Sequence, residues 1–505
     1  MSKKANIILI SPNLKGFSGG INRIVPGLGI GYLAAVLRQA GHNVHVRDTA
    51  VEGYKHEIPL EGKIVLIGES DDLIRNYIAD IRPDIIGISA LFSNLMAHAH
   101  TIARIAKEVD PNIKVIIGGN HISNAVRDYL FACKYPGLGL PEDLVDMLDK
   151  NIDYAIRGEG EAQLLNLVDC LLQGRSVEGI EGIVFRRNGQ LQINEQAKPV
   201  ADLDKLPFPA RDLMNLEAYF KIGLFHSGKA RSKRVLNVMT SRGCPERCTF
   251  CTTPLMWGQK LRVRNPKNVF QEIKEGIDKY RISEVQFEDD TLTANRKNLL
   301  ELCELIEPLA VTWCTPNGIK VNYHHGNRQY EMFKRMADSG CYQVTLACES
   351  GVQRVLDDIA QKKLKIEQIA PAVENAKKAG LLVHTFWIVG YPGETREEME
   401  KTVEFAASIG ADSYTLSILC PLPGTPIRHL IARKNLYWNR KSIDRDIIYR
   451  NSLIRVDGFD SPGEFEAWVE DKTLYLNRLL RQRNAERFDA HYGRDANDGT
   501  LIKQT

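Results

Sequence analysis

The sequence predicts an α/β protein with a doubly wound parallel sheet, a second unit of six βα units forming a partial barrel, and a helical tail. From residue 5 onward, short apolar runs alternate with longer helical patterns, which is typical of parallel sheets covered by helices. The same rhythm starts again after a break rich in proline and charge beyond residue 200. A chain of 505 residues also exceeds what one hydrophobic core usually supports, so we expect at least two domains.

The first unit is expected to span residues 1–200. Its strands are predicted at 5–11, 43–48, 84–89, 114–118 and 153–156, with helices at 30–40, before Pro83 and at 94–109. Doubly wound sheets bind ligands at the carboxyl ends of their strands, where glycine or serine turns let backbone amides approach the ligand. The turns at these strand ends supply the candidate cofactor-binding residues Ser11, Pro12, Ser89, Gly118, Gly119, Gly158 and Glu159.

Residues 201–233 are interpreted as a linker. Pro207-Phe-Pro-Ala-Arg211 can continue neither a helix nor a strand, and Ser227-Gly-Lys-Ala-Arg-Ser-Lys233 is basic and polar. We expect this basic run to be solvated, because most charge runs are, and do not interpret it as a nucleic-acid patch.

The second unit is expected to span residues 234–436, followed by a helical extension over 437–505. Strands are predicted at 235–239, 284–288, 311–315, 343–347, 383–389 and 413–418, with helices between them, for example at 266–280 and 395–409. Barrels of this kind place the active site at the carboxyl ends of their strands. The last stretch, 485–505, is expected to be poorly ordered.

Composition argues against several classes of protein. A net charge of +3 is small for this length and speaks against a protein that binds nucleic acid through phosphate contacts. No apolar run is long enough to span a membrane, and the amino terminus has no cleavage-site pattern, so we expect a cytoplasmic protein. Ten cysteines are too few for a disulfide scaffold, and seven of them are expected to be small buried hydrophobic residues.

The other three cysteines, Cys244, Cys248 and Cys251, stand close together just after the first strand of the second unit. Clustered thiolates select zinc, copper or an iron–sulfur centre. Structural zinc sites and ordinary iron–sulfur cubanes both take four ligands, and the sequence offers no obvious fourth nearby. The loop therefore predicts a cubane with one iron left open to bind another molecule.

This loop resembles the cluster motif of the radical S-adenosylmethionine superfamily, whose open iron binds S-adenosylmethionine. The likeness extends to further strand ends and to Pro421-Leu-Pro-Gly-Thr-Pro426, which is similar to the closing loop of the family. It implies a partial (β/α)6 TIM barrel, with Cys244, Cys248 and Cys251 as cluster ligands. The residues that it implies around S-adenosylmethionine are Phe250, Glu288, Asp289, Asp290, Glu349, Ser350, Val389, Gly390 and Gly393.

The first unit resembles the Rossmann-like cobalamin-binding domain that precedes the barrel in a large subgroup of this superfamily. The likeness rests on residues 26–37, the Gly118-Gly119 turn and Arg157-Gly-Glu-Gly-Glu161. The Asp-x-His-x-x-Gly signature, whose histidine coordinates cobalt in many cobalamin proteins, is absent, and His121 is expected to have an ordinary loop role. The resemblance thus implies three cofactors, a [4Fe-4S] cluster, S-adenosylmethionine and cobalamin, and leaves the lower cobalt ligand open.

Taken together, the resemblance implies a cobalamin-dependent methyltransferase that methylates an unactivated carbon of a small molecule through a 5′-deoxyadenosyl radical and methylcobalamin. Weaker likeness at Ser241-Arg242-Gly243 and at residues 90–96 favours the methylases of phosphonate antibiotic biosynthesis. Two alternatives stay open: a cyclase or oxidase with the same cofactors, and a non-catalytic protein that senses cobalamin. A reducing partner such as flavodoxin or ferredoxin is also implied, whereas substrate identity does not follow from motifs.

Further residues near strand ends have less specific expectations. Asn317, Lys320 and His384 are candidates for the crevice. Tyr342, Trp313 and Trp387 are expected to pack in the core, and Glu284 and Asp412 to cap or to be solvated.

Overall fold

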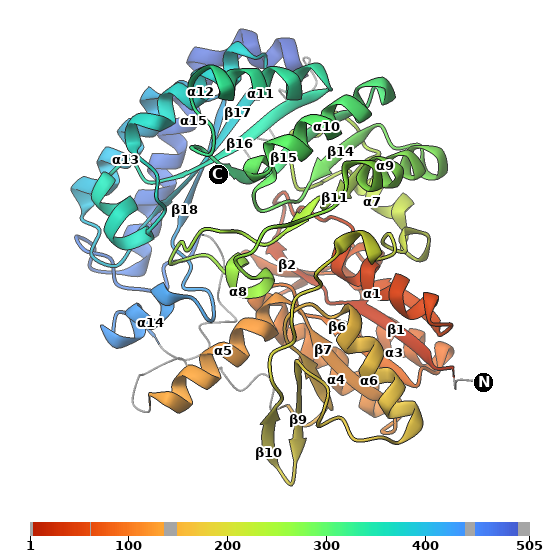
Figure 1. Cartoon of the computed structure of the whole chain (residues 1–505). Coiled ribbons are helices and arrows are strands. Elements are labelled where there is room, and N and C mark those ends of the chain that lie inside the picture. Colours follow the sequence, from red (N-terminus) through yellow and green to blue (C-terminus); the bar gives the residue numbers. More distant parts are fainter. Residues whose placement is uncertain (1–3, 61, 136–148, 440–449, 493–505) are drawn as a thin grey trace.

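The computed structural model describes residues 4–60, 62–135, 149–439 and 450–492. These residues form two large sheets covered by helices, with the short helix α8 (Thr253–Trp257) between them (Figure 1). No helix in these ranges is long and apolar enough to cross a membrane.

The first large sheet has seven strands in the order β10-β9-β8-β7-β6-β1-β3. The five strands from β3 to β8 are parallel, and the antiparallel strands β9 and β10 extend them. Chain order reverses between β1 and β6, which is where open α/β sheets form a ligand crevice. The strands are β1 (Asn6–Ser11), β3 (Asn43–Asp48), β6 (Ile85–Ser89), β7 (Lys114–Gly118), β8 (Tyr154–Ile156), β9 (Ile183–Arg187) and β10 (Gln190–Ile193).

Continuous runs of β-branched and other apolar residues make the central strands, because both faces of the sheet are buried. Ile8 and Ile10 of β1 point into one apolar core, and Ile7 and Leu9 point into the other. Helices α3, α4 and α5 cover the first face, and α1 and α6 cover the second. Their bounds are α1 (Leu28–Gln39), α3 (Asp71–Ile81), α4 (Met96–Val109), α5 (Asn120–Lys134) and α6 (Glu161–Gln173).

The second large sheet has six parallel strands in chain order, β11-β14-β15-β16-β17-β18. All six lie where the sequence predicts them, although β15 and β16 extend beyond the predicted ends. The strands are β11 (Val235–Val238), β14 (Glu284–Phe287), β15 (Thr312–Lys320), β16 (Cys341–Glu349), β17 (Leu382–Val389) and β18 (Ser413–Ile418).

Amphipathic helices cover the outer face of this second sheet and share one apolar core with it (Figure 1). Capping side chains define where two of these helices begin: Asn265 caps α9, and Thr395 with Glu398 forms a capping box at α13. The helices are α9 (Pro266–Tyr280), α10 (Arg296–Ile306), α11 (Gly326–Asp338), α12 (Ile369–Lys378) and α13 (Arg396–Ser408). The helix α14 (Pro426–Arg433) lies apart from them, towards α5 (Figure 1).

Several elements were not anticipated from the sequence. A small antiparallel sheet joins β2 (Leu14–Phe17), β4 (Glu57–Pro59) and β5 (Ile64–Ile67), and β12 (Ser241–Arg242) pairs with β13 (Arg262–Val263). The short helix α2 (Thr49–Glu52) follows β3. The tail contains the long helix α15 (Pro462–Tyr492), which includes the first part of the stretch 485–505 that was expected to be poorly ordered, and 493–505 lie outside the described residues.

The basic run 227–233, expected to be solvated, is only partly so: Arg231 and Lys233 are exposed, whereas Ser227 is buried. The stretch 201–233 contains the helix α7 (Leu216–Ile222), and its basic end packs against the second sheet. Phe225 is 1% exposed and Ser227 is 5% exposed. Periodicity could not reveal this burial, because the segment is irregular and makes its contacts through backbone hydrogen bonds to strand side chains.

Candidate functional site

Cys244, Cys248 and Cys251 lie in one loop that runs from β12 to α8. The Cys244 N–H donates to the Gly258 carbonyl (3.2 Å), and the Cys251 N–H donates to the Cys248 carbonyl (3.1 Å). Thr249 fixes the middle of the loop, since its hydroxyl donates to the Ile359 carbonyl (2.6 Å). The loop is therefore held in shape by the protein itself.

Gly243 sets the backbone direction in which the chain leaves β12 and enters this loop. Its φ of +98° lies in the left-handed region, and a Cβ placed there would come within 2.3 Å of the Lys260 carbonyl oxygen. Only glycine tolerates both the backbone conformation and this close approach. The residue before the first cysteine is thus fixed by sterics.

The three cysteines have the chemistry of a metal-cluster site. All are free thiols, and burial raises the pKa of Cys244 to about 11 and that of Cys251 to about 12, with a smaller contribution from the charge of Cys248. Thiols so desolvated become thiolates when a positive centre compensates them. Among the described residues, no three His, Cys, Asp or Glu side chains are arranged around a single ion. A cluster needs a wider spacing, because each thiolate binds a different iron, so this donor set fits an iron–sulfur cluster.

A buried lysine that sequence reasoning missed lies beside the cysteines. Lys362 Nζ is 2.7 Å from Oε1 of Glu349, which ends β16 with a positive φ of 68°. Burial alone would lower the pKa of Lys362, but the charges of Glu349 and Cys248 raise it above its ordinary value. Lys362 belongs to no motif, so only the fold brings it to the site.

The three acidic residues at the end of β14 have different partners. Asp289 accepts hydrogen bonds from the Thr240 hydroxyl (2.7 Å) and the Ser241 hydroxyl (2.5 Å), so it ties β14 to the strand end beside it. Asp290 accepts from the Thr253 hydroxyl (2.8 Å) and thus faces the cysteine loop, and burial raises its pKa to about 6.

Glu288 points to a further residue that the sequence did not indicate. Its Oε2 lies 2.7 Å from Nδ1 of His226, which comes from the segment taken for a linker. Asn317 donates to the Glu288 carbonyl (2.9 Å) and so lies near this strand end, as expected for a crevice residue.

The turn after β17 reaches the cysteine loop through an aromatic contact. Val389 ends the strand, and the buried Glu394 accepts from the N–H groups of Gly390 (2.8 Å) and Tyr391 (3.0 Å), which shapes the turn. The Tyr391 ring meets Phe250 edge to face, with ring centroids 6.0 Å apart.

Ser350 and Gly393 complete the set predicted around S-adenosylmethionine. The Ser350 hydroxyl is 3.2 Å from that of Thr402, and a Cβ on Gly393 would meet no atom within 4 Å. The predicted residues thus lie at the ends of β14, β16 and β17, the same edge of the sheet as the cysteines.

The candidate residues of the first unit also lie along one edge, at the carboxyl ends of β1, β6, β7 and β8. Ser11 and Pro12 follow β1, and the Ser11 carbonyl accepts from the Thr49 hydroxyl (2.9 Å). At β6 and β7, Ser89 pairs with Gly118, and Gly119 has a φ of +120°.

This edge of the first sheet contacts the cysteine region directly. The Asn120 side chain, next to Gly119, donates to the Thr252 hydroxyl (3.2 Å) just after Cys251. Gly158, which donates to the Ser123 hydroxyl (2.9 Å), lies at the same edge. The carboxyl edges of the two sheets therefore face each other across α8 (Figure 1).

Glu159 joins the two units in a buried ion-pair network. Its carboxylate lies 3.0 Å from Arg242 Nη1 and 2.5 Å from Arg262 Nη2, and Arg242 also pairs with Glu161 at 2.7 Å. All four side chains are less than 8% exposed. The interdomain ion-pair network thus holds the strand that leads into the cysteine loop.

Two further contacts connect the units. Asp128 of α5 accepts from the Gly424 N–H (2.7 Å) and pairs with Arg428 (2.7 Å) at the loop after β18. On the other side, the Tyr219 hydroxyl donates to Asp48 (2.5 Å).

The remaining expectations have mixed outcomes. Trp313, Tyr342 and Trp387 are at most 2% exposed and pack in the core, as predicted. Glu284 and Asp412 are not solvated: they are 0% and 3% exposed and accept backbone hydrogen bonds. Lys320 pairs with Glu246 of the cysteine loop (2.6 Å), His121 lies 2.8 Å from the Ser93 hydroxyl, and His384 lies 2.7 Å from that of Ser413.

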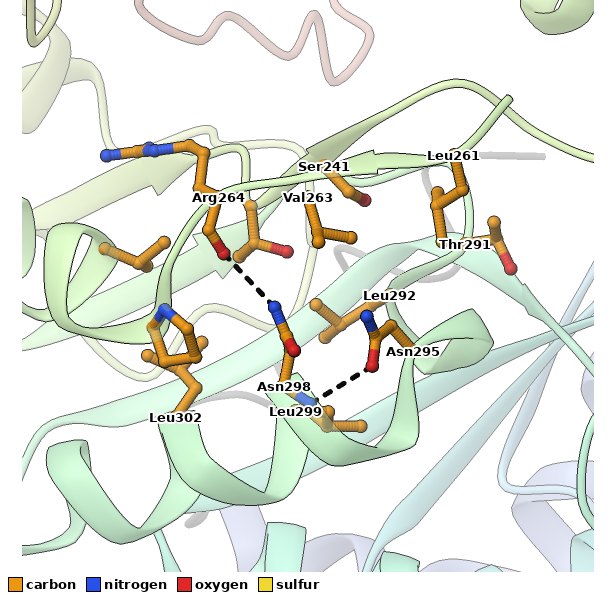
Figure 2. A pocket seen from close by; sticks show the side chains of 13 residues that line it. Ser241, Leu261, Val263, Arg264, Thr291, Leu292, Asn295, Asn298, Leu299 and Leu302 are labelled. Atoms are coloured by element: carbon orange, nitrogen blue, oxygen red, sulfur yellow. Dashed lines mark hydrogen bonds between the residues drawn. The ribbon is translucent and has the colours of Figure 1, made fainter. Parts of the chain in front are cut away.

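A separate pocket opens between β13, α9 and α10 (Figure 2). It shares Thr240 and Ser241 with the surroundings of Asp289, and Asn298 donates to the Arg264 carbonyl (3.3 Å) at its wall. None of the residues predicted to bind a cofactor lines it. We therefore place the functional site at the facing sheet edges.

Comparison with known proteins agrees with this architecture. The family model of the radical SAM superfamily matches residues 238–406, and that of the B12 binding domain matches residues 19–168. The chain is 32% identical over 481 residues to the cytidylyl-2-hydroxyethylphosphonate methyltransferase of Streptomyces wedmorensis, covering 90% of this chain and 86% of that protein. It is also 32% identical over 441 residues to an uncharacterized methyltransferase of Pyrococcus horikoshii, covering 86% and 84%.

A solved structure shows the same fold at lower identity. The radical S-adenosylmethionine methyltransferase TsrM from Kitasatospora setae is 17% identical and superposes with a TM-score of 0.64, over 84% of this chain and 75% of that one. The chain therefore belongs to the radical SAM superfamily, among the methyltransferases that carry a B12-binding domain.

Proposed function

We propose that this methyltransferase methylates a carbon of a small molecule held where the carboxyl edges of its two sheets meet. The observation that carries the proposal is the direct contact between these edges, from Asn120 beside the Gly118-Gly119 turn to Thr252 beside Cys251. A radical SAM domain implies a [4Fe-4S] cluster and S-adenosylmethionine, and a B12-binding domain implies cobalamin. Facing edges would bring all three to one place, and proximity of this kind lowers the barrier for group transfer.

The residues at these edges divide into two proposed sets. Cys244, Cys248 and Cys251 hold the cluster. The strand ends beside the cluster surround S-adenosylmethionine. Their residues are Phe250, Glu288, Asp289, Asp290, Glu349, Ser350, Val389, Gly390 and Gly393. The edge of the first sheet binds cobalamin through Ser11, Pro12, Ser89, Gly118, Gly119 and Gly158. Glu159 holds the two edges together.

When bound, the cluster and S-adenosylmethionine supply hydrogen abstraction, and cobalamin supplies the methyl group. The protein's own groups position these partners. Lys362 fixes the carboxylate of Glu349, and Glu394 fixes the amides of Gly390 and Tyr391. Because these polar groups are already paired and buried, they need little reorganisation when the ligands bind.

Several finer assignments belong to the same proposal. We interpret the first sheet as a Rossmann-like domain over 1–200 and the second as a partial (β/α)6 TIM barrel over 234–436, with 437–505 as an extension. Thiolates that must stay reduced favour the cytoplasm and an electron donor such as flavodoxin or ferredoxin. Likeness to a methyltransferase named for cytidylyl-2-hydroxyethylphosphonate supports a phosphonate or related small molecule as substrate.

Product analysis tests the proposal. The protein is reconstituted anaerobically with iron, sulfide and cobalamin, reduced, and supplied with S-adenosylmethionine and candidate phosphonates. Methylation yields both 5′-deoxyadenosine and S-adenosylhomocysteine, whereas a cyclase yields no S-adenosylhomocysteine. Cys248→Ala should abolish 5′-deoxyadenosine, while Cys133→Ala, on an exposed cysteine outside the loop, should not. If the reduced wild-type protein leaves S-adenosylmethionine intact, the proposal fails.

A further inference from the structure

The basic segment 225–233 crosses the inner face of the second sheet. Gln286 accepts from the Ser227 N–H (3.0 Å), and Glu284 accepts from the N–H groups of Arg231 (2.6 Å) and Ser232 (2.9 Å). These two β14 side chains alternate with Val285 and Phe287, which point into the core beneath the outer helices. The segment therefore lies on the opposite face, inside the curve of the sheet.

Lys229 extends from this segment to the far edge strand. Its Nζ donates to the Ser413 hydroxyl of β18 (2.5 Å). The same hydroxyl lies 2.7 Å from Nδ1 of His384 on β17. A lysine from the segment and a histidine from the sheet thus meet at one hydroxyl.

A third basic side chain comes from the first unit. Arg23 lies in the loop between β2 and α1, and this loop is joined to the segment because the Ile24 N–H donates to the Leu224 carbonyl (2.7 Å). A Cβ on Gly228 would come within 2.2 Å of Arg23 Nη2, so the guanidinium lies against the segment beside Lys229. Arg23, Lys229 and His384 form what we call the basic triad.

Members of the basic triad affect one another's charge. Burial lowers the pKa of Arg23. Burial also lowers the pKa of Lys229 to about 8; the nearby Asp412 favours the positive charge of Lys229, and Arg23 opposes it. Burial lowers the pKa of His384 far below its ordinary value, and Lys229 and Arg23 add to the shift. Two cations held this close create a positive potential that favours a bound anion.

Arg23 differs from the buried arginines that serve structure. Arg211, Arg242 and Arg264 each pair with a buried carboxylate. Within the part of the chain that the structure describes, Arg23 forms no ion pair; neighbouring protein atoms crowd its guanidinium enough to lower its pKa, yet the residue keeps contact with solvent, and Lys229 and His384 are partly exposed. A cation that is accessible, aimed at a second cation and lacking a structural partner is a feature of anion-binding sites.

We propose that Arg23 and Lys229 hold an anionic group of the substrate, a phosphonate, phosphate or carboxylate, on the inner face of the second sheet. This proposal rests on the proposed function, because it names the substrate class of the same methyltransferase. The segment links the basic triad to the strand ends. Ser413 and His384 lie near the amino ends of β18 and β17, whereas His226, three residues before Lys229, pairs with Glu288 just past the carboxyl end of β14. A substrate anchored by its anion would extend its neutral part towards that end, where the other ligands are placed.

Binding of small probes tests the proposal without turnover. Ethylphosphonate, propionate and 1-propanol are titrated into the wild-type protein and into Arg23→Gln, with calorimetry or ligand line broadening as the readout. Arg328→Gln is the matched control, since Arg328 is exposed on α11. Losing one charge-assisted contact should weaken anion binding roughly 10- to 100-fold in Arg23→Gln and leave Arg328→Gln unchanged.

The variant Arg23→Lys keeps the positive charge and should retain part of the affinity for the anions. A near-ultraviolet circular dichroism spectrum like that of the wild type would show that Arg23→Gln still folds. Tighter binding of either anion than of 1-propanol supports the proposal and identifies the anion. Equal affinity in wild type and Arg23→Gln, or equal binding of 1-propanol, overturns it.

Failure of this inference can be told apart from failure of the proposed function. If the wild type methylates a substrate but Arg23→Gln has the same KM, the anion site is wrong and the methyltransferase stands. If ethylphosphonate binds in an Arg23-dependent way but no S-adenosylhomocysteine forms with any substrate, the site stands and the proposed function is wrong.

Discussion

Glu159→Gln should destabilise the whole protein, because Glu159 is the carboxylate that two buried arginines share. Its partners Arg242 and Arg262 are 4% and 6% exposed, and Arg262 has no other carboxylate partner among the described residues. Removing one member of a buried pair leaves an uncompensated charge and costs roughly 3–5 kcal/mol. Unfolding entropy for 505 residues amounts to about 1.1 kcal/mol per degree, so a cooperative transition should move down by roughly 3–5 °C.

Differential scanning calorimetry under anaerobic conditions measures this shift. The control is Glu178→Gln, which breaks the exposed pair between Glu178 and Arg187 and should change the midpoint by less than about 1 °C. The double variant Glu159→Gln with Arg262→Gln should recover part of the loss, since the unpaired charge is then gone. Equal midpoints for Glu159→Gln and Glu178→Gln would refute the reasoning, because the network would then contribute no more than a surface pair.

Three further outcomes are expected. Gly243→Ala forces a Cβ against a backbone carbonyl, so the reconstituted protein should lose most of its iron. Gly29→Ala is the control, because a Cβ at Gly29 meets no atom within 4 Å, and this variant should retain its iron. The iron content of the two reconstituted variants is measured by chemical assay. Burial raises the pKa of Asp48 to about 6, so the stability tied to its protonated form is complete below about pH 4 and is lost as pH rises through 6. Asp48→Asn should therefore gain up to roughly 3 kcal/mol over wild type between pH 4 and 7, and a pH-independent difference in urea midpoints would contradict this. Ethanesulfonate, whose charge is constant, should bind more weakly as pH rises through about 8 and Lys229 loses its proton, whereas binding to Lys229→Gln should not vary with pH there.

The regular elements of the second sheet could be predicted because their signals are local. The strand Ser413–Ile418 and the helix Pro266–Tyr280 have the predicted bounds, since alternation, a proline at the first turn and an asparagine cap mark them in the sequence. The cysteine loop is equally local, because its spacing alone limits the chemistry.

The charged surroundings of the site could not be predicted in the same way. Lys362 and Glu349 are 13 residues apart, and Arg242 and Glu159 are 83 apart, so no short pattern links them. Glu159 shows the difficulty well. Its place in a glycine-rich turn indicates ligand binding, yet the structure shows its carboxylate paired with two arginines of the other unit.

The burial within segment 225–233 was missed for a related reason. Its lysines and arginines are typical of exposed chain, and Arg231 and Lys233 are exposed, but nothing near them in the sequence shows that Gln286 and Glu284 would accept the backbone N–H groups of Ser227 and Arg231. Charge in a sequence indicates solvation only when no buried acceptor is available, and the acceptors here come from a strand more than 50 residues away.

The apolar core of the second sheet includes Ile24, Ala50 and Val51, which belong to the first unit. One core of the first sheet consists of first-unit residues alone, whereas the core of the second sheet is incomplete without these side chains from the first unit. A fragment cut at residue 200 would expose these side chains on one piece and their packing partners on the other, and both pieces would tend to aggregate. The packing that completes the core of the second sheet therefore also helps to fix how the two sheets are placed relative to each other.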